Sequence, residues 1–236
     1  MSEEKLRNIA LLIDADNASH RGIDPVLTVL AELGQVNIRR AYGNWAKPAL
    51  SDWNKITHRY GLQPMQQFDL TKGKNATDMA MTIDAIDLLN AGKVDGFGIM
   101  SSDSDFTPLV TRLRQDGLLV YGFGAAKAPE AFRTACSRFI DVEKLIRTDA
   151  AADDAVSDDT IDPELIELLG GAWKAAHRDD EGWAKLQEVG QIAGNRSSFD
   201  VRNYGYKRLS ELMRAAEGHF ALDRRDNNQM YVKRLR

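Results

Sequence analysis

The sequence predicts an α/β protein built on a central parallel sheet, followed by a small winged-helix domain. In the N-terminal part, short apolar runs of strand length alternate with stretches of helical period, which is typical of βαβ units. Residues 149–161 combine alanines and acids with almost no large apolar side chains, so they cannot cover a core. The C-terminal part has three helical patterns and then two alternating runs around a turn signal. We therefore expect two folded parts, residues 1–148 and 162–236, joined by an acidic linker.

The strands of the N-terminal part are predicted from four apolar runs. Each run is too short for a helix and is followed by polar residues typical of a loop. The predicted strands are residues 9–13, 36–41, 97–100 and 118–123. Because helical stretches separate them, the strands should be parallel and joined by crossover helices.

The predicted helices of the N-terminal part begin and end at recognisable residues. Pro25 after Asp24 marks a helix start, and Thr77 and Asp105 stand at N-cap positions. In the helix that Gly92 ends, four apolar residues recur at helical spacing, which predicts that they share the face that packs on the sheet: Met79, Ile83, Ile86 and Leu89.

The C-terminal part has the pattern of a winged-helix domain. Residues 162–177, 182–194 and 203–218 have the period of short helices. Residues 219–235 then alternate in two runs around Asp226-Asn227-Asn228, which is a hairpin signal. We expect three large apolar side chains of this part in its core: Trp183, Phe199 and Leu209.

Charge is unevenly distributed along the chain. The net charge of -4 would by itself argue against a nucleic-acid partner. However, residues 195–236 hold ten Lys and Arg against five Asp and Glu. The C-terminal part is therefore the part suited to a phosphate backbone.

Composition also predicts a cytoplasmic protein. Cys136 is the only cysteine, so no intrachain disulfide can form, and it reads as a small buried residue. The first residues are too charged for a signal peptide, and no apolar run reaches the roughly 20 residues that cross a bilayer. The four histidines lack the spacing of a zinc site. We therefore expect neither a membrane partner nor zinc.

Acidic residues follow two of the predicted strands and lie at the start of one helix. The first strand runs into "DADN", residues 14–17, and the strand at residues 97–100 runs into "SSDSD", residues 101–105. Asp78 lies in the first turn of a helix. Ligand sites of open parallel sheets lie beyond the carboxyl ends of the strands. The sequence thus predicts one pocket that collects four acids: Asp14, Asp78, Asp103 and Asp105.

Such a cluster requires neutralisation. Two like charges about 4 Å apart cost about 4 kcal/mol at an effective dielectric constant near 20. Either the carboxyl pKa values rise or a divalent cation binds. Ligands that are all oxygen select Mg²⁺ or Mn²⁺, and such an ion suits phosphodiester hydrolysis. Taken singly, Asp105 is also explained as a helix cap and Asp78 by the helix dipole, so the joint pattern carries the prediction.

Three blocks of the N-terminal part resemble the NYN domain, a branch of the PIN-like nuclease superfamily that includes the LabA-like proteins. The blocks are "LLIDADN", "KGKNATDMAMTID" and "MSSDSDFTPLVTRLRQDG", and the resemblance covers residues 9–145. It implies a three-layer PIN-like fold with a central parallel sheet. It also implies an endoribonuclease that hydrolyses RNA phosphodiester bonds with Mg²⁺ or Mn²⁺ as cofactor.

The resemblance assigns roles by motif position. Asp14, Asp78, Asp103 and Asp105 correspond to the metal ligands and catalytic acids of the family. Asn17 would orient substrate or a ligand, and Ser101 or Ser102 would hold water or phosphate. Asp16 would contact the metal ligands without binding the ion itself.

Three more residues of the N-terminal part are candidates for contact with RNA. Lys74 is expected either to face the scissile phosphate or to remain a solvated loop lysine. Tyr42 and Trp45 follow the second strand, where stacking on unpaired bases would be worth about 1–3 kcal/mol each. Packing in the core is the alternative for Trp45.

The C-terminal part resembles the OST-HTH or LOTUS domain, a small winged-helix module, most specifically at "FDVRNYGYKRL". The resemblance implies binding of single-stranded or structured RNA, or of a protein partner. A positive face would be supplied by Arg196, Arg202, Lys207, Arg208 and Arg214. Because Asp200 and Glu211 are interleaved, a solvated helix face is the alternative.

Two other functions remain open at this point. An inactive NYN scaffold would bind RNA or a protein partner without turnover. A phosphatase with an aspartate nucleophile is suggested by "DADN", but Ala18 stands where that motif needs a hydroxyl or β-branched residue. A P-loop enzyme is excluded because no G-x-x-x-x-G-K-[ST] motif occurs.

Overall fold

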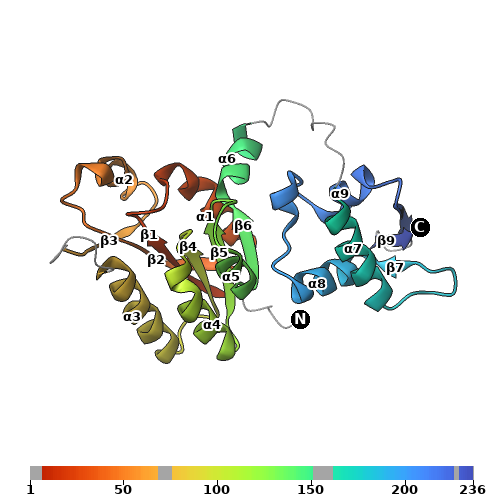
Figure 1. The fold of residues 1–236 in the computed structure, drawn as a ribbon, viewed down its shortest axis with the longest axis horizontal. Coiled ribbons are helices and arrows are strands. Elements are labelled where there is room, and N and C mark those ends of the chain that lie inside the picture. The colour runs from red at the N-terminus through yellow and green to blue at the C-terminus, as the bar shows by residue number, and fades with distance from the viewer. Residues whose placement is uncertain (1–6, 69–75, 151–161, 226–228, 236) are drawn as a thin grey trace. The chain divides into compact units, whose positions relative to one another are not determined.

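A computed structural model describes residues 7–68, 76–150, 162–225 and 229–235 of the chain (Figure 1). The chain divides into two compact units, Met1–Ala150 and Ala151–Arg236. The predicted linker, residues 149–161, lies outside the described residues from position 151 onward. Within the described ranges, no helix combines the length and the apolar character that a membrane span needs.

The first unit is built on a sheet of six parallel strands. The strands lie in the order β3-β2-β1-β4-β5-β6, and every neighbouring pair is parallel. The α/β fold class with a central parallel sheet is therefore confirmed. Two short edge strands were not predicted, because β3 contains Pro64 and both have only four residues. The six strands are β1 (Asn8–Asp14), β2 (Gln35–Gly43), β3 (Gln63–Gln66), β4 (Gly96–Met100), β5 (Leu119–Gly124) and β6 (Arg138–Asp141).

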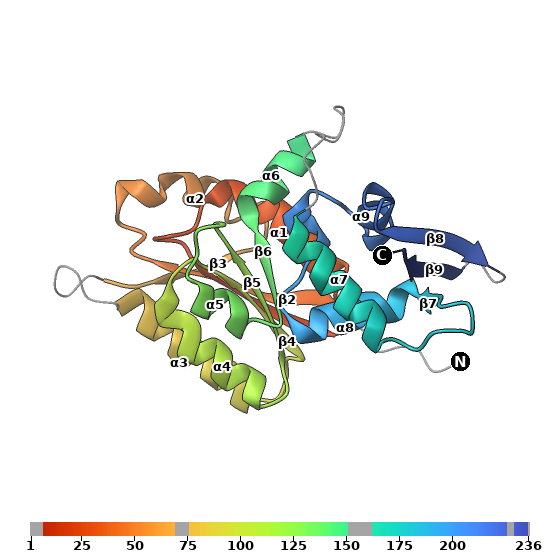
Figure 2. The same cartoon turned by 45° about the vertical axis from the view of Figure 1, so that its right-hand side comes forward.

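Helices cover both faces of this sheet and make three layers (Figures 1 and 2). Alternate residues of β1 point to opposite faces, and residues 9–13 are fully buried. One face packs on α1 (Ile23–Ala31), α2 (Ser51–Ile56) and α6 (Val142–Ala150). The other packs on α3 (Ala76–Asn90), α4 (Thr107–Gln115) and α5 (Glu130–Ala135). Short 3-10 turns complete the unit: η1 (His20–Gly22), η2 (Pro48–Leu50) and η3 (Ser104–Phe106).

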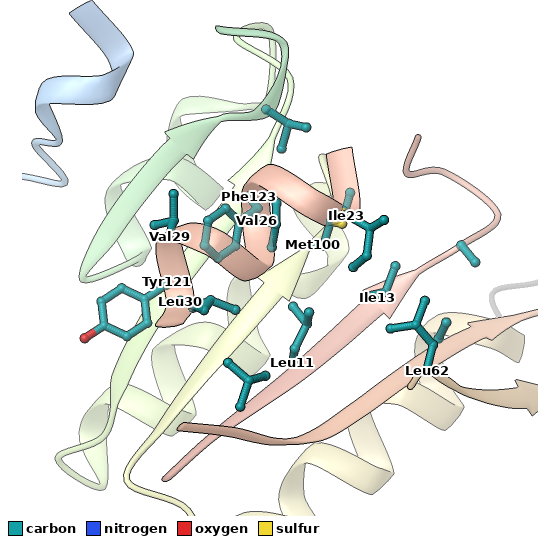
Figure 3. Close-up of a cluster of buried hydrophobic side chains, with 14 of the residues drawn as sticks. Leu11, Ile13, Ile23, Val26, Val29, Leu30, Leu62, Met100, Tyr121 and Phe123 are labelled. Carbon is teal, nitrogen blue, oxygen red and sulfur yellow. The ribbon is translucent and has the colours of Figure 1, made fainter. Parts of the chain in front are cut away.

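The core between the sheet and α1 reaches the carboxyl edge of the central strands. Figure 3 shows Ile13 of β1 and Met100 of β4 near Ile23 of α1, and Phe123 of β5 beside Val26 of the same helix. Each fully buried side chain of this size contributes about 1.5–3 kcal/mol to folding. The ends of these three strands are therefore anchored in the core.

Helix α3 packs on the sheet through a face that the sequence pattern predicted only in part: Ile86 and Leu89 pack against this core as expected, but two other residues of the predicted face do not. Met79 and Ile83 are 65% and 57% exposed, whereas Met81 and Ala85 are buried against the sheet. Both pairs have the same spacing of four residues, so periodicity could not choose between them. Thr77 is likewise not the N-cap: it lies inside the first turn, because the helix begins at Ala76.

A buried polar network attaches α3 to β2. The hydroxyl of Tyr42 and the guanidinium of Arg40 both donate hydrogen bonds to the carboxylate of Asp84, in the middle of α3. Burial and the neighbouring carboxylate raise the pKa of Tyr42, so its hydroxyl stays protonated and remains a donor. This network explains why α3 turns Asp84, rather than Ile83, toward the sheet.

In residues 162–225 and 229–235, the second unit has three α-helices and a three-stranded antiparallel sheet in the order β7-β9-β8 (Figure 2). Phe199 is in its core as predicted, whereas Trp183 and Leu209 are only half-buried. The predicted hairpin turn, residues 226–228, lies outside the described residues. The elements are α7 (Pro163–Ala175), β7 (Ala184–Lys185), α8 (Leu186–Arg196), η4 (Val201–Tyr204), α9 (Leu209–Ala215), β8 (Phe220–Arg225) and β9 (Gln229–Arg234).

Candidate active site

The candidate site lies where the strand order of the large sheet reverses. After β1 the chain builds β2 and β3 on one side, and from β4 onward it builds β5 and β6 on the other. The connections leave β1 and β4 in opposite directions, which opens a crevice beyond the carboxyl ends of these two strands. Asp14 ends β1, and residues 101–105 follow β4 directly.

Asp14 is completely buried at this point. Its Oδ2 accepts hydrogen bonds from Asn17 Nδ2 at 3.0 Å and from Ser101 Oγ at 2.9 Å. Its Oδ1 is also buried and has no hydrogen-bond partner among the residues that the structure describes. Burial raises the pKa of Asp14, and the two hydrogen bonds offset part of this effect. A buried carboxylate oxygen without a partner is costly, so Asp14 is suited to a cation or a proton.

Three other acids come together beside Asp14. Carboxylate oxygens of Asp78, Asp103 and Asp105 lie within 4.8 Å of one another. Asp103 accepts the backbone N–H of Asp105 at 2.9 Å and so caps η3. The sequence assigned Asp105 as the N-cap of the following helix, but Asp105 lies within η3 and the residue before α4 is Phe106. Asp14 is outside this group of three, yet among the neighbouring charges it has the largest effect on Asp78. All four predicted acids therefore lie within electrostatic reach of one another.

The clustering changes the acidity of Asp78. Partial burial, followed by the charges of Asp14, Asp103 and Asp105, raises the pKa of Asp78 to about 6. The carboxylates thus repel each other as the sequence predicts, and a proton or a cation at this place lowers their energy.

Asp16 and Thr77 hold the first turn of α3 against the end of β1. Thr77 is buried, and its hydroxyl donates to Asp16 Oδ2 at 3.0 Å. Lys47 lies 3.6 Å from the other oxygen of Asp16. Thr77 precedes Asp78, so this contact positions the acid of α3. Sequence reasoning placed Asp16 behind the cluster but missed Thr77, because a Thr near a helix start reads as a cap.

The two predicted serines have different partners. Ser101 joins Asp14 to the next loop, since its Oγ also accepts the backbone N–H of Asp103 at 3.1 Å. Ser102 Oγ accepts the backbone N–H of Ala125 at 2.8 Å and ties the end of β4 to the loop after β5. Both therefore hold the backbone that carries the acids.

The two aromatic candidates, Tyr42 and Trp45, differ in how far their side chains are buried. Tyr42 is 1% exposed and its hydroxyl is paired with Asp84, so its ring cannot stack on a base. The prediction for Tyr42 is corrected on this ground. Trp45 is half-buried against the core, and its Nε1 donates to the carbonyl of Met65. Lys74 lies outside the described residues.

The basic candidates of the second unit differ in whether their side chains are already paired. The guanidinium of Arg202 pairs with Asp200, which is 4% exposed, at 3.1 and 3.3 Å. Lys207 and Arg208 are exposed, and the side chain of Glu211 accepts both of their backbone N–H groups. Arg202 therefore stabilises its own loop, while Lys207 and Arg208 present positive charge to solvent.

We expect Asp78→Asn to stabilise the metal-free protein at high pH. The folded-state pKa of Asp78, about 6, lies above the ordinary 3.8, so the ionised form disfavours folding. This penalty is complete above pH 6 and disappears as the pH falls toward 3.8. After solvent screening, the free energy of unfolding should rise by about 1 kcal/mol at about pH 8 and by less at about pH 5.

Denaturation in EDTA at the two pH values measures this effect. Asp87→Asn, an exposed acid on the same helix, is the matched control and should change stability little at either pH. A gain for Asp78→Asn that is larger at the lower pH would contradict the assignment.

Comparison with known proteins agrees with this architecture. The profile of the NYN domain family matches residues 8–144, and that of the OST-HTH/LOTUS domain matches residues 158–232. No curated protein sequence matches the chain. A solved structure of a protein of unknown function from Vibrio parahaemolyticus is 20% identical, with a TM-score of 0.49, and covers 60% of this chain and 96% of its own. Since the profile of the NYN domain family matches more than half of the sequence, the chain belongs to this family, and it carries a C-terminal OST-HTH/LOTUS domain.

Proposed function

We propose that the protein is a metal-dependent endoribonuclease whose C-terminal unit recruits RNA. The NYN domain implies a nuclease-type fold, and the OST-HTH/LOTUS domain suggests RNA binding. One observation carries the proposal: acids from β1, α3 and the loop after β4 gather at the switch point of the sheet. If these acids served only to stabilise the starts of their own helices, they would not need to lie close to one another.

The residues of the site fit Mg²⁺ or Mn²⁺. Asp78, Asp103 and Asp105 offer only oxygen ligands, which hard divalent ions prefer, and Asp14 adds a buried oxygen without a hydrogen-bond partner among the described residues. When bound, such an ion supplies charge neutralisation at the phosphate and an activated water. NYN and other PIN-like nucleases generally use divalent metals, which supports this assignment.

The side chains around the acids then hold the site in place. Asn17 and Ser101 fix Oδ2 of Asp14 and leave Oδ1 to the cation. Asp103 keeps its orientation through the cap of η3, and Thr77 with Asp16 fixes the helix of Asp78. Preorganised carboxylates of this kind lower the cost of arranging charge during the reaction.

The direct test is cleavage of labelled RNA by the full-length protein. Single-stranded and structured RNA are incubated with Mg²⁺, Mn²⁺ or EDTA, and products are separated by length. We expect internal cleavage with a divalent ion and none in EDTA. RNA that is bound but never cut under any condition would overturn the nuclease and favour an inactive NYN scaffold.

We expect Lys207→Ala with Arg208→Ala to weaken RNA binding by the full-length protein. On single-stranded RNA, each lost phosphate contact should make the slope of log K against log salt concentration less steep by about 0.7. Stability should change little, because alanine keeps the backbone N–H groups that Glu211 holds. Affinity measured at several salt concentrations tests this.

Two comparisons make the result specific. Lys174→Ala with Lys185→Ala removes the same charge from exposed positions on α7 and β7. Arg202→Ala should instead lower stability, because it leaves buried Asp200 unpaired. Equal loss of affinity in both double variants would show that only net charge matters.

A further inference from the structure

A cavity opens near the acid cluster, at the same edge of the sheet but on the face that α1 and α6 cover. Its volume is about 520 Å³, within the range of small-ligand sites. It lies among η1, the ends of β4 and β5, and α6, which packs on α1 and η1. All of its walls belong to the first unit. The acids lie toward α3 and α4, so the two features flank the carboxyl ends of β1 and β4.

Two residues belong to both places, and a third adjoins them in the chain. Asn17, Ser101 and Ser102 line the cavity, and Asn17 and Ser101 also hydrogen-bond the carboxylate of Asp14. A molecule in the cavity would therefore be separated from Asp14 by one layer of side chains. The cavity therefore borders the residues that hold Asp14, although none of the four acids lines it.

The inside and the rim of the cavity differ in chemistry. Its apolar walls come from Met100, Phe123, Val142 and Ile146, at the end of the core that Figure 3 shows. The rim carries three basic side chains and one acid, which are Arg21, Lys127, Arg147 and Glu143. All four are exposed, and within the described ranges the three basic side chains form no ion pair.

We infer that this cavity receives one unpaired nucleotide of the RNA strand, next to the phosphate that is cut. The base would enter between the apolar walls, and its phosphate would lie on the basic rim. A flat aromatic base with an anionic phosphate matches apolar walls with a net positive rim. A base held in a duplex cannot enter, so the substrate class is RNA that is unpaired beside the cleaved bond. This inference rests on the proposed function.

The first test detects nucleotide binding without metal and without cleavage. Met100 lines the cavity, so its ¹³C-methyl NMR signal in the full-length protein reports occupancy. Met81, on the opposite face of the sheet, and Met213, in the second unit, are internal references. In EDTA, adenosine and uridine 5′-monophosphate should shift Met100 but not Met213. No shift of Met100, or an equal shift with inorganic phosphate alone, would overturn the nucleotide site.

Charge reversal on the rim provides a matched pair of variants. Lys127→Glu should weaken the Met100 response to nucleotide about tenfold, since it places an anion beside the phosphate. Lys93→Glu makes the same change at the amino end of β4, remote from the cavity, and should leave the response unaltered. Equal effects of the two variants would also overturn the site.

The second test uses single-stranded RNA in which one abasic position is moved along the strand. Cleavage beside the abasic position should fall at least tenfold on one side only, and unchanged cleavage at every position would overturn the inference. If no RNA is cut at all, the nuclease proposal fails, while the Met100 titration still decides whether the cavity binds nucleotides.

Discussion

Asp103→Asn is expected to lower RNA cleavage by about 100-fold or more while the fold remains intact. The loss of one carboxylate from the group of three weakens the neutralisation of charge at the reacting phosphate, and about 3 kcal/mol of barrier corresponds to about 100-fold in rate. Asparagine can still accept the N–H of Asp105, so the cap of η3 is preserved. Single-turnover cleavage with saturating Mn²⁺ measures the effect.

Thermal denaturation and RNA binding by the same variant separate chemistry from folding. In EDTA, RNA binding should match that of the unchanged protein, and thermal stability should be equal or slightly higher, because the change removes one of the charges that repel Asp78. Asp87→Asn removes an equal charge from an exposed position on α3 and should cleave normally. Cleavage by Asp103→Asn at the normal rate would mean that the acid group is not the catalytic centre.

Asp84→Ala is expected to destabilise the first unit by about 2–4 kcal/mol. The change leaves the buried hydroxyl of Tyr42 and the partly buried guanidinium of Arg40 without their carboxylate. Since α3 carries Asp78, a looser helix should also weaken the binding of Mn²⁺. Urea denaturation in EDTA measures the first effect and metal-induced stabilisation the second.

Asp87→Ala is the control for this prediction. It lies three residues further along the same helix and is exposed, so it should cost less than about 0.5 kcal/mol. A similar loss in the two variants would mean that the network with Tyr42 and Arg40 does not hold α3 on the sheet, since alanine by itself favours the helix at both positions.

Local patterns predicted the parts of this fold that depend on buried apolar runs. The strands β1, β4 and β5 appear close to their expected positions because each is an apolar run next to a turn signal. The strand β2 also appears where it was expected, although polar residues interrupt its apolar ones. The edge strand β3 is mostly exposed and becomes a strand by pairing with β2, so it lacks this pattern. The strand β6 is buried, but its four residues are too few to give a recognisable apolar run. The packed face of α3 was predicted correctly for Ile86 and Leu89 but wrongly for Met79 and Ile83, because Met81 and Ala85 form a second apolar row at the same spacing.

The candidate site was only partly accessible from the sequence. Asp14 stood out because a charge directly after a buried strand has no local explanation. Tyr42 and Arg202 looked like RNA contacts because aromatic and basic side chains near loops are typical of such surfaces. Their partners, Asp84 and Asp200, became clear only from the fold. The catalytic roles of the acids stay a prediction until cleavage is measured.

The sequence by itself determined the parallel α/β class, the family, and the placement of acids after β1 and β4 and at the start of α3. The tertiary structure decided which acids approach one another, which polar side chains are already paired, and where a cavity adjoins them. The physical reason is that periodicity reports which side of an element avoids water. The partner that satisfies a buried charge comes from a distant segment, and only the packed chain brings the two together.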